Sequence, residues 1–174
     1  QVNNAVKAKL SIPYDKALKK PEKRRYEKTT VTVENLTTTS AAKKLLVNGE
    51  KPLALNFANG YTPGGGFLNF GCRAQEEVLC RMSALHETLE TDPMYVFHNE
   101  NTDFGSSSWA ILSPDVPVFR DDNYNPLDTP WPLSFITCAA PEADSVGQPK
   151  STTLLRERIH RVLEIAESYG YSSL

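Results

Sequence analysis

The sequence predicts a single α/β domain with a largely parallel or mixed sheet. Segments with the composition of strands alternate along the chain with segments of helical periodicity, which is the order typical of this class. The length of 174 residues suits one domain with one substantial hydrophobic core. No apolar run is long enough to cross a bilayer, so we expect no membrane partner.

The expected elements follow from periodicity and from residues that start or stop helices. The expected strands are residues 30–34, 53–57, 95–98, 109–112 and 134–138, and the expected helices are residues 40–47, 75–89 and 152–169. Ser40 is the expected N-cap of the first helix, and Asn48-Gly49 is its expected stop. The apolar faces expected for the two longer helices are Val78, Met82, Leu85 and Leu89 in one, and Leu155, Ile159, Val162, Leu163 and Ala166 in the other.

Two long loops are expected between these elements. Residues 58–74 follow a predicted strand, and residues 113–133 contain many Pro, Asp and Asn residues, which favours an irregular loop. Because ligands of α/β folds bind at the carboxyl ends of strands, we expect a site at the 58–74 loop and at the 139–141 turn. In the second loop, residues 116–120 either pack Phe119 into the core or line a pocket for a base.

Positive charge is concentrated at the start of the chain. Residues 1–28 hold nine of the nineteen Lys and Arg residues and three of the twenty-one Asp and Glu residues, a net charge of +6, and the remainder carries −8. We treat residues 1–28 as a basic arm or helix and residues 29–174 as the functional domain. A solvated arm is the favoured interpretation, and an accessory contact to a polyanion is the alternative. Direct nucleic-acid binding is therefore not expected.

The cysteine and histidine residues predict neither a disulfide framework nor a metal site. Cys72, Cys80 and Cys138 are an odd number in apolar or helical contexts, which favours reduced thiols in a cytoplasmic protein. His86 has no second histidine at zinc-protease spacing, and no other His and Cys residues have ligand spacing. We expect no metal and no cofactor.

Three consecutive glycines, Gly64, Gly65 and Gly66, lie in the first long loop. They cost chain entropy, but they allow backbone N–H groups to approach a ligand closely. A strand, a glycine-rich loop and then a helix is a recurrent way to hold phosphate, and it needs no basic side chain. The segment lacks the spacing of a P-loop or of a dinucleotide fold. The residues alone therefore leave two interpretations, a phosphate-holding loop and a flexible turn.

Two carboxylates, Glu76 and Glu77, open the helix that follows this loop. Acidic residues near a helix N-terminus interact favourably with its dipole, which is one explanation for them. Neither glutamate lies on the expected apolar face. Adjacent helical side chains diverge by roughly 100°, so the two carboxylates cannot easily flank one bond as a glycosidase pair does. We expect one to act chemically and the other to hold a hydroxyl.

These motifs together resemble the poly(ADP-ribose) glycohydrolases. Gly-Gly-Gly, a spacer of eight residues and Gln75-Glu76-Glu77 match the fingerprint of that family, and Asn56–Asn59, residues 109–120 and residues 135–141 are similar to its microbial branch. The resemblance covers roughly residues 15–174. It implies a macrodomain-like, three-layer α/β/α fold with a mixed, largely parallel sheet.

The resemblance also implies roles for individual residues. Glu77 matches the catalytic glutamate, and Glu76 matches the residue that binds the ribose hydroxyls. Gly64, Gly65 and Gly66 match the first diphosphate loop. Asn59 matches the asparagine near the distal ribose, and Gln75 is grouped with the substrate-binding residues.

The implied function is hydrolysis of ribose–ribose O-glycosidic bonds in poly(ADP-ribose), with release of ADP-ribose. The implied partners are poly(ADP-ribose) and ADP-ribosylated proteins. Members of the family continue past the last helix into a strand and a second diphosphate loop, so the chain is expected to be incomplete at its C-terminus. The alternatives are a non-catalytic module that binds ADP-ribose and an inactive fragment.

Overall fold

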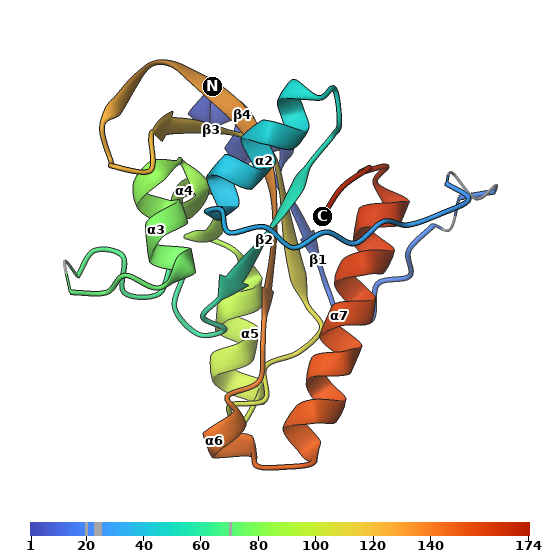
Figure 1. The fold of residues 1–174 in the computed structure, drawn as a ribbon. Coiled ribbons are helices and arrows are strands. Elements are labelled where there is room, and N and C mark those ends of the chain that lie inside the picture. The colour runs from blue at the N-terminus through green and yellow to red at the C-terminus, as the bar shows by residue number, and fades with distance from the viewer. Residues whose placement is uncertain (20, 23–25, 70) are drawn as a thin grey trace.

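The computed structural model describes every residue except 20, 23–25 and 70, and shows a sheet between helices (Figure 1). The helices are α1 (Val2–Ala8), α2 (Thr38–Val47), α3 (Gln75–Met82), α4 (Leu85–Leu89), α5 (Pro93–Asn101), α6 (Ala143–Val146) and α7 (Lys150–Ser168). The strands are β1 (Leu10–Ile12), β2 (Leu53–Ala58), β3 (Ala110–Arg120) and β4 (Pro126–Ala139). The predicted α/β class is confirmed.

The sheet has the strand order β1-β3-β4-β2. β2 pairs with β4 in parallel, whereas β1 with β3 and β3 with β4 pair antiparallel. The predicted mixed sheet is therefore confirmed, but its antiparallel pairings outnumber the parallel one. One of the two antiparallel pairings is local, because β3 turns directly into β4 as a hairpin.

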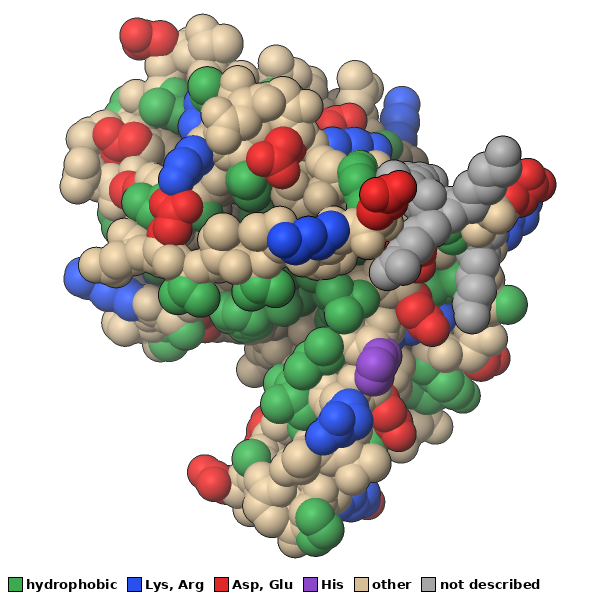
Figure 2. Space-filling view, turned by 45° about the vertical axis from the view of Figure 1, so that its right-hand side comes forward, with side chains coloured by type: hydrophobic (Ala, Val, Ile, Leu, Met, Phe, Trp, Pro, Cys, Tyr) green, Lys and Arg blue, Asp and Glu red, His purple; other side chains and the backbone are tan. Residues whose placement is uncertain are grey.

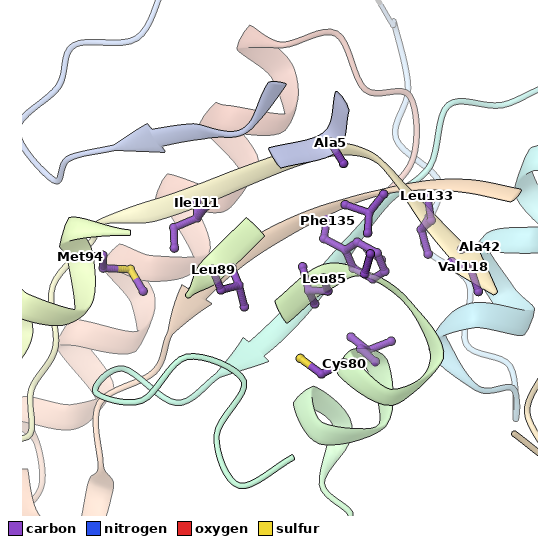
Figure 3. Close-up of a cluster of buried hydrophobic side chains, with 14 of the residues drawn as sticks. Ala5, Ala42, Cys80, Leu85, Leu89, Met94, Ile111, Val118, Leu133 and Phe135 are labelled. Carbon is purple, nitrogen blue, oxygen red and sulfur yellow. The ribbon is translucent and has the colours of Figure 1, made fainter. Parts of the chain in front are cut away.

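Each face of the sheet carries its own hydrophobic cluster, which confirms the three layers. On one face, Phe135 and Ile111 pack with residues of α3, α4 and α5, as Figure 3 shows around Leu85 and Leu89. On the other face, Ile136 and its neighbours pack against α7. Residues 135 and 136 serve opposite layers because successive side chains of a strand point to opposite faces.

The predicted helix 75–89 is interrupted at Ser83. This residue is extended, bridges to Val118 of β3, and its hydroxyl donates to the Leu79 carbonyl at 2.8 Å. The break turns α4 relative to α3. Within α3, Val78 was expected on the buried face but is only half-buried, whereas Leu79, Cys80 and, as predicted, Met82 are buried.

Two segments have a different structure from the one predicted. Residues 95–98 belong to helix α5, where the Asp92 side chain caps Met94 N–H and Pro93 occupies the first turn. This Asp-Pro start is a helix signal that outweighs the β-branched and aromatic composition. Residues 113–133 form most of the β3–β4 hairpin rather than an irregular loop. The pairing shifts register between Ser113 and Val116, where Pro114 lies, and again between Val118 and Arg120, while Pro117 and Pro132 lie opposite each other.

The predicted strand at residues 30–34 is absent, and this part of the chain crosses the molecule as coil (Figure 1). Val31 and Val33 are 85% and 95% exposed, so the β-branched residues meet no partner strand. β propensity without a strand to pair with does not produce a strand.

The first residues of the predicted basic arm, residues 1–28, pack into the domain. Within residues 1–28, α1 and β1 contribute Ala5 and Ile12 to the two core clusters. Four of the predicted cations, Lys20, Lys23, Arg24 and Arg25, lie outside the described residues. The domain boundary at residue 28 stays a prediction.

The last helix forms as predicted, but its apolar residues are split between two environments. Val162 and Ala166 are buried against the sheet, together with the unexpected Arg158 and Arg161. Leu155, Ile159 and Leu163 are about half exposed, and Figure 2 shows apolar surface on the side of the molecule where α7 lies. In the described ranges 1–19, 21–22, 26–69 and 71–174, no helix combines the length and apolar character that a membrane span needs.

Candidate active site

Two adjacent carboxyls are buried where α3 begins, beside the carboxyl end of β2. Glu76 is 2% exposed and Glu77 is 9% exposed. Burying two carboxyls is costly unless other groups satisfy them. The polar contacts of these two residues therefore define the site. We call residues 58–74, which run from β2 to α3, the site loop.

Glu76 is held against β2 and the start of the site loop. Its Oε1 accepts from Asn56 Nδ2 at 3.1 Å, and its Oε2 accepts from the Asn59 backbone N–H at 2.7 Å. The pKa of Glu76 is raised to about 7, mainly by burial and to a smaller extent by the nearby Glu77, against the lowering effect of its hydrogen bonds. Glu76 therefore changes its protonation near neutral pH.

Asn56 is suited to both protonation states of Glu76. This strand residue is fully buried, its Nδ2 also donates to Thr137 Oγ1 at 3.2 Å, and its Oδ1 has no partner among the residues described. Turning the amide by 180° would place Oδ1, an acceptor, against Glu76. A protonated Glu76 needs such an acceptor, and an ionised one needs the donor.

Glu77 contacts the glycines of the site loop instead. Its Oε1 accepts from the Gly66 N–H at 3.0 Å. Its Oε2 is buried and has no hydrogen-bond partner within the described part of the chain. Buried oxygens without a partner are rare in proteins, and this atom is the one polar group of the acid pair that the described residues leave unsatisfied. The predicted divergence of the two glutamates agrees with this geometry.

The glycines of the site loop allow the backbone to lie against the acids. Gly64 and Gly65 have φ angles of +69° and +55°, which side chains disfavour. A Cβ on Gly65 would lie 2.5 Å from Glu77 Oε1 and 3.3 Å from Glu76 Oε2. The glycines form a turn that packs closely against the two acids, so a side chain on Gly65 would displace the Glu77 carboxyl. Whether this turn holds phosphate stays a prediction.

Gln75 connects α3 to the open edge of β2. Its Oε1 accepts from the Phe57 N–H at 2.9 Å, and its Nε2 donates to the Leu55 carbonyl at 2.7 Å and to Thr38 Oγ1 at 3.2 Å. All of its amide groups are engaged in this way. Its assignment to substrate binding stays a prediction, and its observed contacts position the first turn of α3.

Asn59 organises the start of the site loop. Its Oδ1 accepts from the N–H groups of Tyr61 and Thr62 at 2.8 and 2.9 Å, which closes a tight turn. Its backbone N–H holds Glu76, as described above. Its predicted contact with a distal ribose remains untested, and its position beside Glu76 is compatible with it.

A second loop, residues 102–108, lies beside the start of the site loop and was missed by sequence analysis. We call it the flanking loop. A Cβ on Gly60 would lie 2.4 Å from Ser106 Oγ, so the two loops touch. His98 joins them, with Nδ1 at 2.8 Å from the Gly60 carbonyl and Nε2 accepting from the Ser107 N–H at 3.1 Å. The sequence signal was a histidine, His98, placed shortly before the Gly- and Ser-rich segment 105–108.

Phe119, expected either in the core or at a base pocket, contacts the core and also lines a surface pocket. Phe119 packs against one core cluster while it is only partly buried. It also lines a surface pocket of about 580 Å³ together with Phe67 and His86. A role in binding a base stays a prediction.

The cysteines and potential metal ligands give no second site. Burial raises the pKa of Cys138 to about 11 and also raises that of Cys80, so both thiols stay protonated near neutral pH. Among the residues that the structure describes, no group of three His, Cys, Asp or Glu residues is arranged to hold a metal ion.

The fold and the site together define a class of protein: a three-layer α/β domain with a buried carboxyl pair against a glycine loop. Residues 1–121 match the family model described as the microbial-type PARG catalytic domain, where PARG is poly(ADP-ribose) glycohydrolase. The chain belongs to this family. The comparison with curated proteins gave no match.

Solved structures support the same assignment. Poly(ADP-ribose) glycohydrolase from Thermomonospora curvata has a TM-score of 0.86 and 34% identity, over 98% of this chain and 65% of that chain. Its complex with the inhibitor ADP-HPD has a TM-score of 0.82 and 37% identity, over 98% and 64%. The Deinococcus radiodurans enzyme in complex with ADP-ribose has a TM-score of 0.79 and 32% identity, over 98% and 72%. The chain thus spans less than two thirds of the Thermomonospora curvata chains.

Proposed function

We propose that the chain hydrolyses ribose–ribose O-glycosidic bonds in poly(ADP-ribose) and releases ADP-ribose, with Glu77 as general acid and base. The observation that carries the proposal is the buried, unpartnered Oε2 of Glu77, whose other oxygen is fixed by Gly66. Family membership and the ADP-ribose complexes of similar structures support the choice of substrate.

In the proposed reaction, Glu77 first donates a proton to the leaving ribose oxygen. Positive charge then develops at the anomeric carbon as the glycosidic bond breaks, and Glu77 takes a proton from the attacking water. The contact with Gly66 keeps one carboxyl oxygen in place while the other exchanges the proton. Fixing the acid in this way favours reaction, because misplacement of about 1 Å can cost roughly 10²-fold in rate.

Glu76 and the glycines have supporting roles in the proposal. Glu76 binds ribose hydroxyls, since its carboxyl is already oriented by Asn56 and Asn59. The diphosphate lies against Gly64, Gly65 and Gly66, whose lack of side chains allows the close approach. The N–H groups of Gly65 and Gly66 already donate to the Thr62 carbonyl and to Glu77 Oε1. The diphosphate then lies near the positive charge that develops on the sugar and stabilises it. The three cysteines, all free thiols, support a cytoplasmic location.

The test is the Glu77→Gln variant. General acid–base catalysis contributes roughly 10²–10⁴-fold, so hydrolysis of poly(ADP-ribose) should fall by about that factor, while calorimetry shows ADP-ribose still bound. Glu167→Gln, a change of the same kind on the exposed side of α7, is the control and should leave turnover unchanged.

Three outcomes separate this proposal from its alternatives. Unchanged hydrolysis by the Glu77→Gln protein would contradict the role of Glu77. Binding of ADP-ribose without hydrolysis by the unsubstituted chain would identify a non-catalytic reader. Absence of both would leave only the inactive fragment.

A further inference from the structure

The flanking loop has an unusual backbone for its sequence. Phe104 and Ser106 have φ angles of +55° and +51°, in the left-handed region that favours glycine. A non-glycine residue in this region is strained and persists only where surrounding contacts impose the conformation. The neighbouring Gly105, which would tolerate this conformation easily, does not adopt it.

Buried side chains impose this conformation. Arg158 of α7 is 5% exposed and donates to the Gly105 carbonyl at 3.1 Å and to Ser108 Oγ at 2.8 Å. His98 holds Ser107, and the Glu142 N–H donates to the Phe104 carbonyl at 2.9 Å. The loop is therefore fixed from both sides of the sheet, and its exposed side chains have a defined position.

The side chain that this loop presents is an aromatic ring. Phe104 is 54% exposed. Its ring leans on that of Tyr61, with centroids 6.1 Å apart and planes at 59°. Tyr61 is fixed in turn, because its hydroxyl lies 3.2 Å from Thr102 Oγ1 and accepts from the Ser106 N–H at 3.3 Å. The pair is thus a rigid aromatic surface with one open face.

This surface adjoins the start of the site loop, because a Cβ on Gly60 would touch Ser106 of the flanking loop. Tyr61 follows Asn59 by two residues, and Asn59 holds Glu76, whereas the three glycines come after Tyr61 along the site loop. In the proposed binding mode, the glycines hold the diphosphate and Asn59 is near the distal ribose. The Tyr61–Phe104 pair then lies beyond the distal ribose, where the leaving part of the polymer must be.

The chemistry of the polymer determines what arrives there. The bond that breaks joins the distal ribose of one unit to the adenosine ribose of the next. The adenine of the leaving unit is therefore only one ribose away from the reacting carbon. The charged side chain exposed on the flanking loop is Asp103, an acid, and Arg158 is buried, so the loop suits an uncharged planar group better than a phosphate.

We propose that Phe104, supported by Tyr61, is a stacking subsite for the adenine of the leaving ADP-ribose unit. This inference rests on the proposed function for the identity of the substrate. Stacking of a base on an aromatic side chain changes affinity by about 5-fold to 150-fold. The subsite acts on polymer and not on free ADP-ribose, because only the polymer has a leaving adenine.

The experiment compares two ligands in the Glu77→Gln background, where binding is measured without turnover. Phe104→Ala should weaken binding of a short ADP-ribose oligomer by about 5-fold to 150-fold and leave binding of ADP-ribose unchanged. Phe104→Trp should retain oligomer binding. Tyr124→Ala is the matched control, because Tyr124 is also aromatic, 41% exposed and at positive φ, but lies in the β3–β4 turn.

A kinetic arm uses the chain with Glu77 intact. Phe104→Ala should lower kcat/KM for the oligomer and not for an ADP-ribose that carries a simple alkyl group on its distal ribose. Equal losses for both substrates, or equal losses of oligomer and ADP-ribose binding, would overturn the subsite. A chain that binds the oligomer through Phe104 but hydrolyses neither substrate would support the subsite and refute the proposed hydrolysis.

Discussion

The site loop and the flanking loop lie side by side and both contain residues in the left-handed region, but they reach it by opposite means. In the site loop the residues are glycines, and a side chain on Gly65 would meet both catalytic candidates. In the flanking loop they are Phe104 and Ser106, which adopt the conformation because Arg158 and His98 fix their neighbours.

The difference teaches where each loop is sensitive. The conformation of the site loop requires glycine at position 65, so a methyl group added there would press directly on Glu77 and Glu76. The flanking loop depends on remote anchors, so the changes that disturb it lie in α5 and α7. Each loop also contacts a titrating side chain whose pKa is shifted. The pKa of Glu76, which contacts the site loop, is raised, and the pKa of His98, which contacts both loops, is lowered. The two groups therefore make stability depend on pH in opposite directions.

The largest effect should come from Gly65→Ala. The new Cβ would collide with the Glu77 carboxyl, and displacement of a catalytic group by about 1 Å costs roughly 10²-fold in rate. Gly49→Ala is the control, because Gly49 also has positive φ, +81°, but a Cβ there meets nothing within 4 Å. Steady-state hydrolysis of polymer by both variants measures the difference. If the two lose equal activity, backbone strain and not contact with Glu77 is responsible.

The next effect concerns stability and the raised pKa of Glu76. The folded state holds the Glu76 proton to about pH 7 and the unfolded state only to about 4.5. Stability from this group is thus fully present below pH 4.5 and is lost as the pH rises through 7. Glutamine does not titrate, so Glu76→Gln should gain about 2–3 kcal/mol relative to the unsubstituted chain between pH 4.5 and 8. Chemical denaturation at both pH values tests this, and a constant difference would exclude it.

A smaller effect is expected from Arg158→Met. Methionine retains most of the buried stem but leaves the Gly105 carbonyl and Ser108 Oγ without their donor, which should cost about 1–3 kcal/mol of unfolding free energy. Affinity for an ADP-ribose oligomer should fall as the flanking loop loosens. Arg156→Met, on the exposed side of the same helix, should change neither quantity. Equal behaviour of the two variants would show that Arg158 does not fix the loop.

The smallest effect is a pH dependence at His98. Burial lowers its pKa from the ordinary 6.5, so the folded state binds the proton less readily than the unfolded state. Stability from His98 is therefore complete above pH 6.5 and is lost as the pH falls below that value toward the lower folded-state pKa. His98→Asn should be less sensitive to pH in this window than the unsubstituted chain. His160→Asn, which changes an exposed histidine, should retain the full dependence.

Local signals were sufficient for the parts of the fold that use local interactions. The stop of α2, the apolar run of β2 and the periodicity of α7 all predicted elements that exist. The N-cap expected at Ser40 was wrong, because α2 begins earlier and Thr37 is its cap, with the Thr37 side chain accepting from the Ser40 N–H. The family fingerprint identified the glycines and Glu76-Glu77, which the structure brings together. The strand predicted at residues 30–34 is wrong because a strand also needs a neighbouring strand, and Val31 is exposed with none beside it among the described residues. The loop predicted at residues 113–133 is wrong because prolines usually disfavour strands, and the sequence does not show that β3 pairs with β4.

The missed parts of the site depend on contacts between distant segments. Arg158 has the same sequence appearance as the exposed Arg156, and only the packing of α7 on the sheet distinguishes them. Asn56 did carry a signal, since an amide inside an apolar strand must find a buried partner. That partner, Glu76, is twenty residues away. The strand sequence indicates that Asn56 needs a partner, and only the fold shows that this partner is Glu76.

The Gln75 side chain has a consequence for the behaviour of the chain in solution. β2 is an edge strand, and its Phe57 side chain is 66% exposed, which is the kind of edge that recruits strands from other molecules and leads to aggregation. Gln75 occupies the Phe57 N–H and the Leu55 carbonyl with its own amide, so it imitates one peptide group of a neighbouring strand. A single side chain at the start of α3 thus occupies two backbone groups of this edge that a strand from another molecule would need.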